Sequence, residues 1–167
     1  KTLYENTILI VDDSPEIIDI IVDILEDFNT KISISGEDAL EIIFKDEPPD
    51  LILLDVIMPK MNGFEVCRQL RANPQTMEIP IIFLTIKTLK DDIVHGFDAG
   101  GQDYITKPFD GRELIERIKT HLELKAQREI LRNVNVILEE KVLKRTEELK
   151  NALEKLDDAN KELQGLD

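Results

Sequence analysis

Residues 49–71 read PDLILLDVIMPKMNGFEVCRQLR, which is a short apolar run, a loop and an amphipathic segment in direct succession. The run Leu51–Leu54 is apolar at every position, as is typical of a strand buried on both faces of a parallel sheet. Met58-Pro59 and Asn62-Gly63 mark the loop that follows, and Gly63–Ala72 has the apolar spacing of a helix. This stretch therefore predicts one strand–helix unit of an α/β fold.

The same alternation extends in both directions along the chain. Short β-branched runs predict strands, and the periodic stretches between them predict helices. The predicted strands are Thr7–Val11, Lys31–Ser35, Leu51–Leu54, Ile81–Thr85 and Tyr104–Thr106, and the predicted helices are Pro15–Phe28, Glu37–Lys45, Gly63–Ala72, a stretch about Asp91–Ala99 and one that opens near Gly111. Ser14-Pro15 supplies a helix N-cap, and Asp110 and Glu113 have the spacing of a capping box. The pattern predicts a doubly wound, five-stranded parallel sheet with helices on both faces.

Acidic residues are concentrated in the predicted α/β part of the chain. The 167 residues carry a formal net charge of −14, and up to Thr120 there are 24 Asp and Glu against 12 Lys and Arg. A surface of this sign repels phosphate backbones and anionic lipid, which argues against direct binding to nucleic acid or to a membrane surface. Cys67 is the only cysteine, and no apolar run approaches the roughly 20 residues of a membrane span. We therefore expect a cytoplasmic protein.

Polar side chains follow the predicted strands at the edge where an open parallel sheet binds ligands. The first strand ends at Asp12-Asp13, the third at Asp55 and the fourth at Thr85, and Lys107 follows the fifth. Clustered carboxylates repel one another unless a hard cation such as Mg²⁺ lies among them, and a lysine can balance the charge of a transferring phosphoryl group. The available nucleophile in this set is a carboxylate, whose product would be an aspartyl phosphate.

Four stretches carry a resemblance to a known family: ILIVDDSPE (8–16), residues 49–71, IPIIFLT (79–85) and GGQDYITKPF (100–109). They resemble the receiver domain of response regulators in two-component systems, and the match spans roughly Asn6 to His121. The resemblance implies a flavodoxin-like receiver over residues 1–121. It also implies a phosphorelay in which a sensor histidine kinase or a phosphotransfer protein donates the phosphoryl group.

The resemblance further implies a role for each residue at this edge of the sheet. Asp55 would accept the phosphoryl group, Lys107 would bind one of its oxygens, and Thr85 and Tyr104 would be switch residues that move with it. The ligands of Mg²⁺ would be Asp12, Asp13, Asp55 and the backbone carbonyl of Ile57. The Lys107–Pro108 peptide bond would be cis. Ile57 and Ile86 depart from the polar or small residues common at their positions, so we expect slow loss of phosphate.

Two other interpretations use the same residues differently. A phosphatase of the haloacid dehalogenase type expects Asp-x-Asp after its first strand, whereas Asp12 and Asp13 are adjacent, so we disfavour it. A pseudo-receiver that serves only as a phosphorylation-independent dimerisation module is the remaining alternative. We expect no enzyme activity beyond phosphorylation and dephosphorylation of Asp55. Cys67 is assigned as an apolar filler, and His95 and His121 as structural or solvated.

The last predicted helix continues far beyond the α/β part. Because no proline follows Arg112 and only Gly165 interrupts the sequence, the helix can extend for about 55 residues. Apolar residues recur at steps of three and four, with Asn135 and Arg145 as polar members of the same seam: Leu124, Leu131, Leu138, Val142, Leu149, Ala152, Leu156, Ala159 and Leu163. This pattern predicts a coiled-coil signalling helix over 122–167 and a parallel homodimer through 124–163, with a single solvated helix as the alternative. Residues 138–164 are similar in composition to helices that join receivers to output domains, so we expect such a domain outside this chain.

Overall fold

The computed structural model describes residues 1–86 and 98–165, and the chain divides into two compact units, Lys1–Lys125 and Ala126–Asp167. The first unit contains the sheet, and the second consists of the continuation of the last helix. The predicted helix about Asp91–Ala99 falls largely within residues 87–97, which lie outside the described residues, as does His95.

The first unit is a five-stranded parallel sheet with the strand order β2-β1-β3-β4-β5. The strands are β1 (Thr7–Val11), β2 (Asn29–Ser33), β3 (Leu51–Asp55), β4 (Ile81–Ile86) and β5 (Asp103–Lys107). A 3-10 turn, η1 (Leu3–Glu5), precedes them, and the described helices are α1 (Pro15–Ile24), α2 (Gly36–Lys45), α3 (Gly63–Arg71) and α5 (Gly111–Gln164). The predicted doubly wound α/β fold is confirmed.

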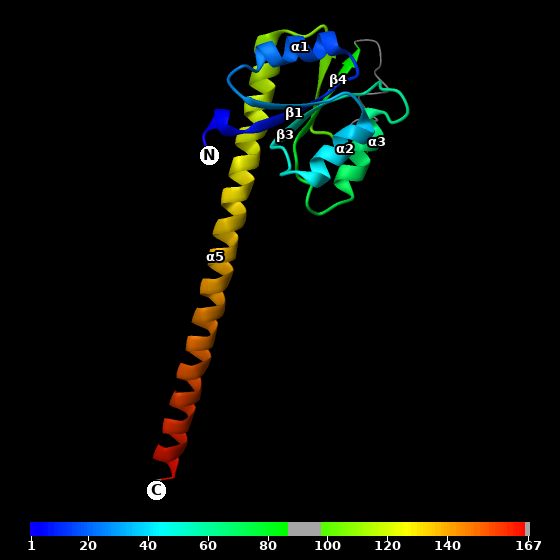
Figure 1. Cartoon of the computed structure of the whole chain (residues 1–167). Coiled ribbons are helices and arrows are strands. Elements are labelled where there is room, and N and C mark those ends of the chain that lie inside the picture. Colours follow the sequence, from blue (N-terminus) through cyan, green and yellow to red (C-terminus); the bar gives the residue numbers. More distant parts are fainter. Residues whose placement is uncertain (87–97, 166–167) are drawn as a thin grey trace. The chain divides into compact units, whose positions relative to one another are not determined.

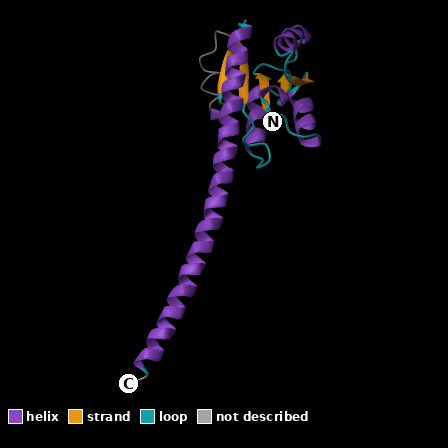
Figure 2. Cartoon of the chain, turned by 90° about the vertical axis from the view of Figure 1, so that its left-hand side faces the viewer, coloured by secondary structure: helices purple, strands orange, loops and turns teal. Residues whose placement is uncertain are grey.

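Helices lie on both sides of the sheet (Figure 1, Figure 2). Alternate residues of the central strands belong to two separate cores, one on each side. On one side, Leu9, Ile52 and Phe83 pack with residues of α2 and α3. On the other side, Ile10 and Leu53 pack with residues of α1 and of the first turns of α5. Because β1, β3 and β4 are buried on both faces, their sequences are apolar without alternation.

The boundaries of α1 and β2 differ from the prediction. The apolar periodicity of residues 15–28 predicted a helix through Phe28, but α1 ends at Ile24, and the buried Leu25 and Phe28 pack on the core from a turn. β2 lies two residues earlier than predicted because it pairs in parallel with β1 from Thr7 opposite Asn29 onward. The apolar Ile34 suggested a later strand, yet this side chain is 61% exposed.

Side-chain caps start the helices at the predicted positions. Ser14 Oγ accepts from the backbone N–H of Ile17, with Pro15 in the first turn of α1. Asp110 Oδ1 accepts from the backbone N–H of Arg112 at the start of α5. Glu113, which was predicted to complete a capping box, forms an ion pair with Arg117 one turn later. The Lys107–Pro108 peptide bond is cis, as predicted.

Arg71, at the end of α3, connects the loops that lead into β4 and β5. Its Nε donates to the Gly100 carbonyl at 2.8 Å, and its Nη1 donates to the Ile79 carbonyl at 2.8 Å. Its Nη2 donates at 2.9 Å to Gln102 Oε1, which also accepts from the backbone N–H of Ile81 at 2.7 Å. One guanidinium therefore satisfies backbone groups of two loops that are distant in sequence.

Replacement of Arg71 by methionine should lower the free energy of unfolding by about 2 kcal/mol, because several part-buried carbonyls lose their donor while the apolar stem is retained. Urea denaturation would measure the change. Arg68→Met is the matched control, since Arg68 lies on the exposed side of the same helix. Equal effects of the two substitutions would contradict this role for Arg71.

The second unit is helical from Ala126 to Gln164, and every described side chain in it is exposed. An i, i+4 ion pair between Lys161 and Asp157 supports the helix locally. None of the helices in residues 1–86 and 98–165 is long and apolar enough to cross a membrane.

Candidate functional site

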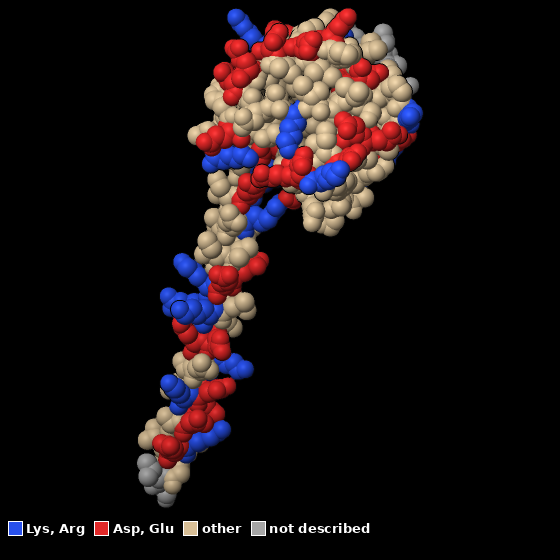
Figure 3. All heavy atoms as spheres, viewed as in Figure 1, with Lys and Arg blue, Asp and Glu red and all other residues tan. Residues whose placement is uncertain are grey.

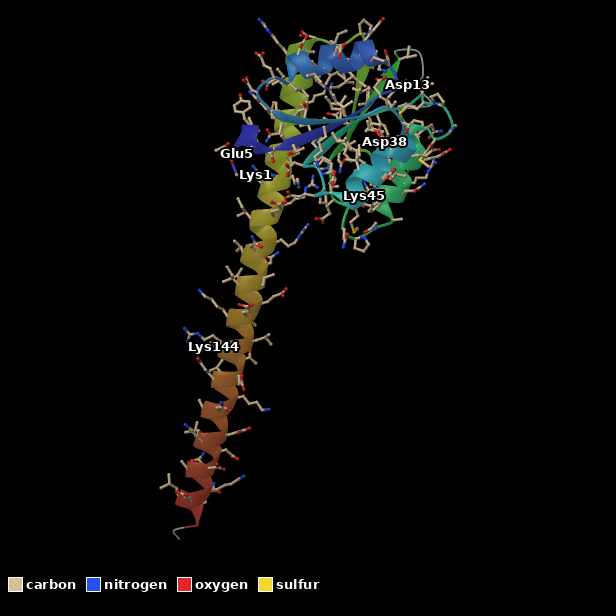
Figure 4. The ribbon with its side chains drawn as sticks, viewed as in Figure 1. Lys1, Glu5, Asp13, Asp38, Lys45 and Lys144 are labelled. Atoms are coloured by element: carbon tan, nitrogen blue, oxygen red, sulfur yellow. The ribbon has the colours of Figure 1, made fainter. Side chains whose placement is uncertain are left out.

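Three carboxylates meet at the carboxyl edge of the sheet, as predicted. Asp12 and Asp13 follow β1, and Asp55 is the last residue of β3. Since β1 and β3 are hydrogen-bonded neighbours, their ends lie together, and oxygen atoms of the three carboxylates all lie within 4.8 Å of one another. Asp13, labelled in Figure 4, is exposed, whereas Asp12 and Asp55 are buried.

Lys107 joins two of these carboxylates from the end of β5. Its Nζ lies 2.8 Å from Asp12 Oδ2 and 3.3 Å from Asp55 Oδ1. Burial lowers the pKa of Lys107, but the hydrogen bond to Asp12 and the negative charges of Asp55 and Asp12 outweigh burial, and the pKa is raised above its ordinary value. Lys107 is therefore a fixed positive charge beside Asp55.

Asp55 holds its proton more tightly than an ordinary aspartic acid. Burial and the negative charge of Asp12 raise its pKa to about 7, although Lys107 and the Ile57 backbone N–H act in the opposite direction. The N–H of Ile57 donates to Asp55 Oδ1 at 3.4 Å. Ionisation of Asp55 is therefore opposed first by burial and then by the neighbouring Asp12 carboxylate, and a cation bound beside Asp55 would favour its ionised form.

The donor set fits Mg²⁺. Asp12, Asp13 and Asp55 offer hard carboxylate oxygens, two of the carboxylates are buried, and both burial and the charge of Asp12 raise the pKa of Asp55. Ile57 lies in the loop that follows β3, and its backbone N–H donates to the carboxylate of Asp55. Its carbonyl as a fourth protein ligand stays a prediction.

Asp12 is oriented by both of its oxygens. Oδ1 accepts from the backbone N–H of Ser14 at 2.9 Å, and Oδ2 accepts from Lys107. The backbone N–H of Asp12 donates to the Ser33 carbonyl at 3.1 Å, which extends the β1–β2 pairing by one step. The carboxylate is therefore fixed between the start of α1 and the end of β5.

The two predicted switch residues lie on the neighbouring strands β4 and β5. Thr85 is buried, and it follows Leu84, which pairs with Asp55 across the β3–β4 ladder. Its hydroxyl donates to the Ile86 carbonyl at 3.4 Å. Tyr104 packs, partly buried, against the core under α2 and α3. Thr85 thus lies beside the acidic cluster, and movement of either residue with phosphate stays a prediction.

Sequence reasoning missed the role of Gly63. Its N–H donates to the Val56 carbonyl at 2.9 Å, and a Cβ on this residue would lie 2.3 Å from the carbonyl oxygen of Asp55. Asn62-Gly63 was interpreted only as a turn and a helix start. Because Gly63 has no side chain, the start of α3 can also approach the end of β3, which carries Asp55.

Cys67 and His121 are buried or paired within the first unit. Cys67 is buried and its Sγ–H donates to the Ala99 carbonyl, and burial raises the pKa of the thiol to about 11. His121 Nε2 lies 3.0 Å from Asp103 Oδ2, and Arg117 contacts the other oxygen of the same carboxylate. These contacts join α5 to β5.

Comparisons with known proteins agree with this geometry. The chain is 37% identical to the receiver domain of a signal transduction histidine kinase from Syntrophus aciditrophicus, with a TM-score of 0.66 over 71% of this chain and 90% of that one. It is 30% identical to the chemotaxis protein CheY4 of Vibrio cholerae, with a TM-score of 0.65 over 70% of this chain and 98% of that one.

One curated relative is longer. It is a probable cyclic di-GMP phosphodiesterase of Vibrio cholerae serotype O1, 44% identical over 150 residues that make up 89% of this chain and 34% of the relative. The chain therefore spans about a third of that relative's length. The family model described as the response regulator receiver domain matches residues 8–119. Since this match includes strands β2 to β5, all of β1 after Thr7, and the acidic cluster at the carboxyl edge, the chain belongs to the response regulator receiver domain family.

Proposed function

We propose that Asp55 accepts a phosphoryl group from the phosphohistidine of a sensor histidine kinase or phosphotransfer protein. The main support for this proposal is the position of Lys107. Its Nζ lies 3.3 Å from Asp55 Oδ1 and 2.8 Å from Asp12 Oδ2. A buried carboxylate with a fixed ammonium beside it and two further acids within 4.8 Å suits a reaction in which negative charge arrives on a phosphoryl group.

In this reaction a carboxylate oxygen of Asp55 forms a bond to phosphorus as the bond from phosphorus to the donor's imidazole nitrogen breaks. The electron pair of the broken bond stays on the imidazole, which leaves as a neutral ring or takes up a proton. Lys107 remains protonated and pairs with a phosphoryl oxygen, while Asp12, Asp13 and Asp55 would hold the metal. Mg²⁺, when bound, neutralises carboxylate charge and organises the phosphoryl oxygens.

The test is the intact mass of the protein after incubation with acetyl phosphate and Mg²⁺. We expect a gain of one phosphoryl group in the wild type, and no gain in Asp55→Asn or in wild type treated with EDTA. Asp38→Asn is a matched control, because Asp38 lies in the first turn of α2, where its carboxylate accepts from Ser33 Oγ, and it lies outside the acidic cluster. A gain of the same size in Asp55→Asn would contradict Asp55 as the acceptor.

Loss of phosphate from Asp55 should be slow. Ile57 and Ile86 are 54% and 50% exposed, and neither side chain can orient water by a hydrogen bond. Ile57→Asn should increase the hydrolysis rate on the order of tenfold, which is about 1.4 kcal/mol in activation free energy. Decay of the phosphorylated mass after removal of acetyl phosphate would measure the rate. Met77→Asn, which replaces an exposed apolar residue of the first unit, should leave the rate unchanged. A wild-type half-life of seconds with no effect of Ile57→Asn would contradict the proposal.

We also propose that the chain forms a parallel homodimer through residues 124–163. The side chains of the predicted seam are exposed, including Leu131, Leu149 and Leu156 at 62–64%. A shallow groove on the helix is lined by Asn135, Leu138, Glu139, Val142 and Leu143. Residues 135, 138, 139 and 142 have the spacing i, i+3, i+4 and i+7, which in a coiled coil forms a hole for one side chain of the facing helix.

Light scattering should give the mass of a dimer at micromolar concentration, and the mass of a monomer would contradict this proposal.

The helix couples the receiver to an output domain in this proposal. The 150-residue alignment with the probable cyclic di-GMP phosphodiesterase is longer than the unit Lys1–Lys125, so it includes part of the helix. We propose an output of that class for the longer protein and a cytoplasmic location, where histidine kinases present their phosphohistidine. The acidic first unit, whose Asp and Glu side chains predominate on the face seen in Figure 3, does not favour direct binding to nucleic acid.

A further inference from the structure

The pair Asn62-Gly63, at the start of α3, has a reactivity that the proposed function does not use. It is the only Asn-Gly pair in the 167 residues. The backbone nitrogen of the residue after an asparagine can attack the carbon of the side-chain amide, and glycine hinders this attack least because it has no Cβ. Asn62 is partly exposed and Lys60 is exposed, so solvent reaches this part of the loop. The pair is therefore a candidate for spontaneous deamidation.

Deamidation at this pair proceeds through a five-membered ring. The backbone nitrogen of Gly63 loses its proton and forms a bond to Asn62 Cγ, and the side-chain nitrogen of Asn62 leaves as ammonia with that proton. Water then opens the resulting succinimide at one of its two carbonyl carbons. Opening at Cγ gives aspartate, whereas opening at the backbone carbonyl carbon gives isoaspartate, in which the main chain continues through Cβ and Cγ.

The folded structure holds both reacting groups away from the geometry of ring closure. The N–H of Gly63 donates to the Val56 carbonyl at 2.9 Å. Asn62 Oδ1 accepts from the backbone N–H of Glu65 at 3.0 Å. The backbone of Asn62 is extended, with φ −80° and ψ 168°, and ring closure requires rotation about its Cα–C bond, which would withdraw Gly63 from Val56. Asn62 therefore does not react while these two hydrogen bonds are intact.

The residues on either side of the pair are anchored in the core. Met61 is partly buried against the core under α2 and α3, where its Cβ and Cγ lie beside Gly36. Phe64 is 6% exposed, and its ring meets the ring of Phe83 edge-on with 5.2 Å between the centroids. α2 and α3 lie side by side (Figure 1). Opening of the start of α3 must loosen these contacts, so only a small fraction of the molecules is open at any time.

We infer that Asn62 is a site of spontaneous deamidation that reacts when the start of α3 opens, and that the isoaspartyl product prevents phosphorylation of Asp55. The second part rests on the proposed function. Isoaspartate adds one carbon atom to the main chain directly before Gly63. The structure has no space for it there, since even a Cβ on Gly63 would lie 2.3 Å from the Asp55 carbonyl oxygen and 3.1 Å from the Val56 Cα. The end of β3, which carries Asp55, must then shift.

The aspartyl product should leave phosphorylation intact. Aspartate is as good an N-cap as asparagine, and its carboxylate can accept from the backbone N–H of Glu65 in place of Asn62 Oδ1. The new negative charge lies at the N-terminus of α3, where the helix dipole favours it. The main chain also keeps its length. The two products of one reaction therefore differ in their effect on Asp55.

Incubation of the full chain in mildly alkaline buffer, either folded or unfolded in urea, tests the first part of the inference. Trypsin cleaves after Lys60 and Arg68, and the mass of the peptide 61–68 gives the fraction of Asn62 that has been converted. We expect conversion to be at least about tenfold slower in the folded chain than in urea, because only the open state reacts.

Two phenylalanine variants test whether opening of α3 controls the rate. Phe64→Leu should raise the rate in the folded chain by about threefold or more, because it weakens an anchor of α3, and should leave the rate in urea unchanged. Phe44→Leu is the matched control, since Phe44 is 48% exposed on α2, and it should change neither rate. Equal rates in the folded and unfolded chain, no detectable conversion in the folded chain, or equal effects of the two variants would overturn the first part.

The aged chain is then treated with acetyl phosphate and Mg²⁺, and its isoaspartate content is measured with an isoaspartyl methyltransferase. The phosphorylated fraction should fall by the fraction of isoaspartate, whereas fresh Asn62→Asp should be phosphorylated to the same extent as fresh wild type. Normal phosphorylation of a sample rich in isoaspartate, or an equal loss in Asn62→Asp, overturns the second part. If fresh wild type gains no phosphoryl group, the proposed function itself has failed, while the deamidation rates still decide the first part.

Discussion

Gly63→Ala should destabilise the receiver by about 3 kcal/mol and reduce phosphorylation of Asp55. The added Cβ would lie 2.3 Å from the Asp55 carbonyl oxygen and 3.1 Å from the Val56 Cα. All of these contacts are with backbone, so no side-chain rotation can relieve them, and overpacking of this kind costs about 1–3 kcal/mol or more. Either α3 or the end of β3 must shift. Urea denaturation and the intact mass after acetyl phosphate treatment would measure the two effects.

Gly111→Ala is the matched control for this substitution. Gly111 is the first residue of α5, and its Cβ would meet only side-chain atoms of Ile24 at 3.4–3.7 Å, an ordinary contact distance. This variant should be neutral or more stable by up to about 1 kcal/mol, because alanine restricts the unfolded chain. If Gly63→Ala were as stable as Gly111→Ala, the close approach of α3 to Asp55 would not matter for the fold.

Asp55→Asn should stabilise the metal-free protein at pH 8, and the gain should disappear as the pH falls towards 4. The pKa of Asp55 is about 7 in the folded protein against an ordinary value of 3.8, because of burial and the charge of Asp12. Between these two values the folded state binds a proton that the unfolded state has released, so stability falls as the pH rises from about 4 to about 7. Asparagine cannot ionise, so the Asp55→Asn variant does not lose this part of the free energy of unfolding as the pH rises.

The expected gain at pH 8 is between about 1 and 4 kcal/mol, since one pKa unit corresponds to about 1.4 kcal/mol. Thermal unfolding of the two proteins in EDTA at pH 5 and pH 8 would measure it. Mg²⁺ should reduce the difference at pH 8, because it stabilises the ionised wild-type cluster more than the variant. A difference in stability that is the same at both pH values would contradict the raised pKa.

The sequence predicted the sheet well because its central strands are buried on both faces. In Leu51–Leu54 apolar and polar residues do not alternate, and such a short, wholly apolar run is typical of a strand buried on both faces of a parallel sheet. The edge strand β2 was misplaced because its position depends on pairing with β1, and the exposed Ile34 resembled a strand residue. The pattern of apolar residues therefore predicts the boundaries of the central strands more accurately than those of an edge strand.

The acidic cluster could be predicted for the same topological reason. Neighbouring parallel strands end at the same edge, so Asp12, Asp13 and Asp55 had to meet if the strands were correct. Lys107 was predicted at this edge because it follows the fifth strand, but its ion pairs with Asp12 and Asp55 were not predicted. The hydrogen bonds of Arg71 and the approach of Gly63 to Asp55 depend on distances between elements. The spacing of residues along the chain does not give the distances between elements, so these contacts could not be predicted from the sequence.

The unbroken course of α5 from Gly111 to Gln164 also constrains how proteins of this architecture can vary in length. A flexible tether tolerates added residues, because only its reach changes. A continuous helix turns the residues after an insertion by about 100° for each inserted residue, so most insertions move the apolar seam to another side of the helix. In the proposed coiled coil, length variants that keep the three- and four-residue seam in register should therefore differ by seven residues or a multiple of seven.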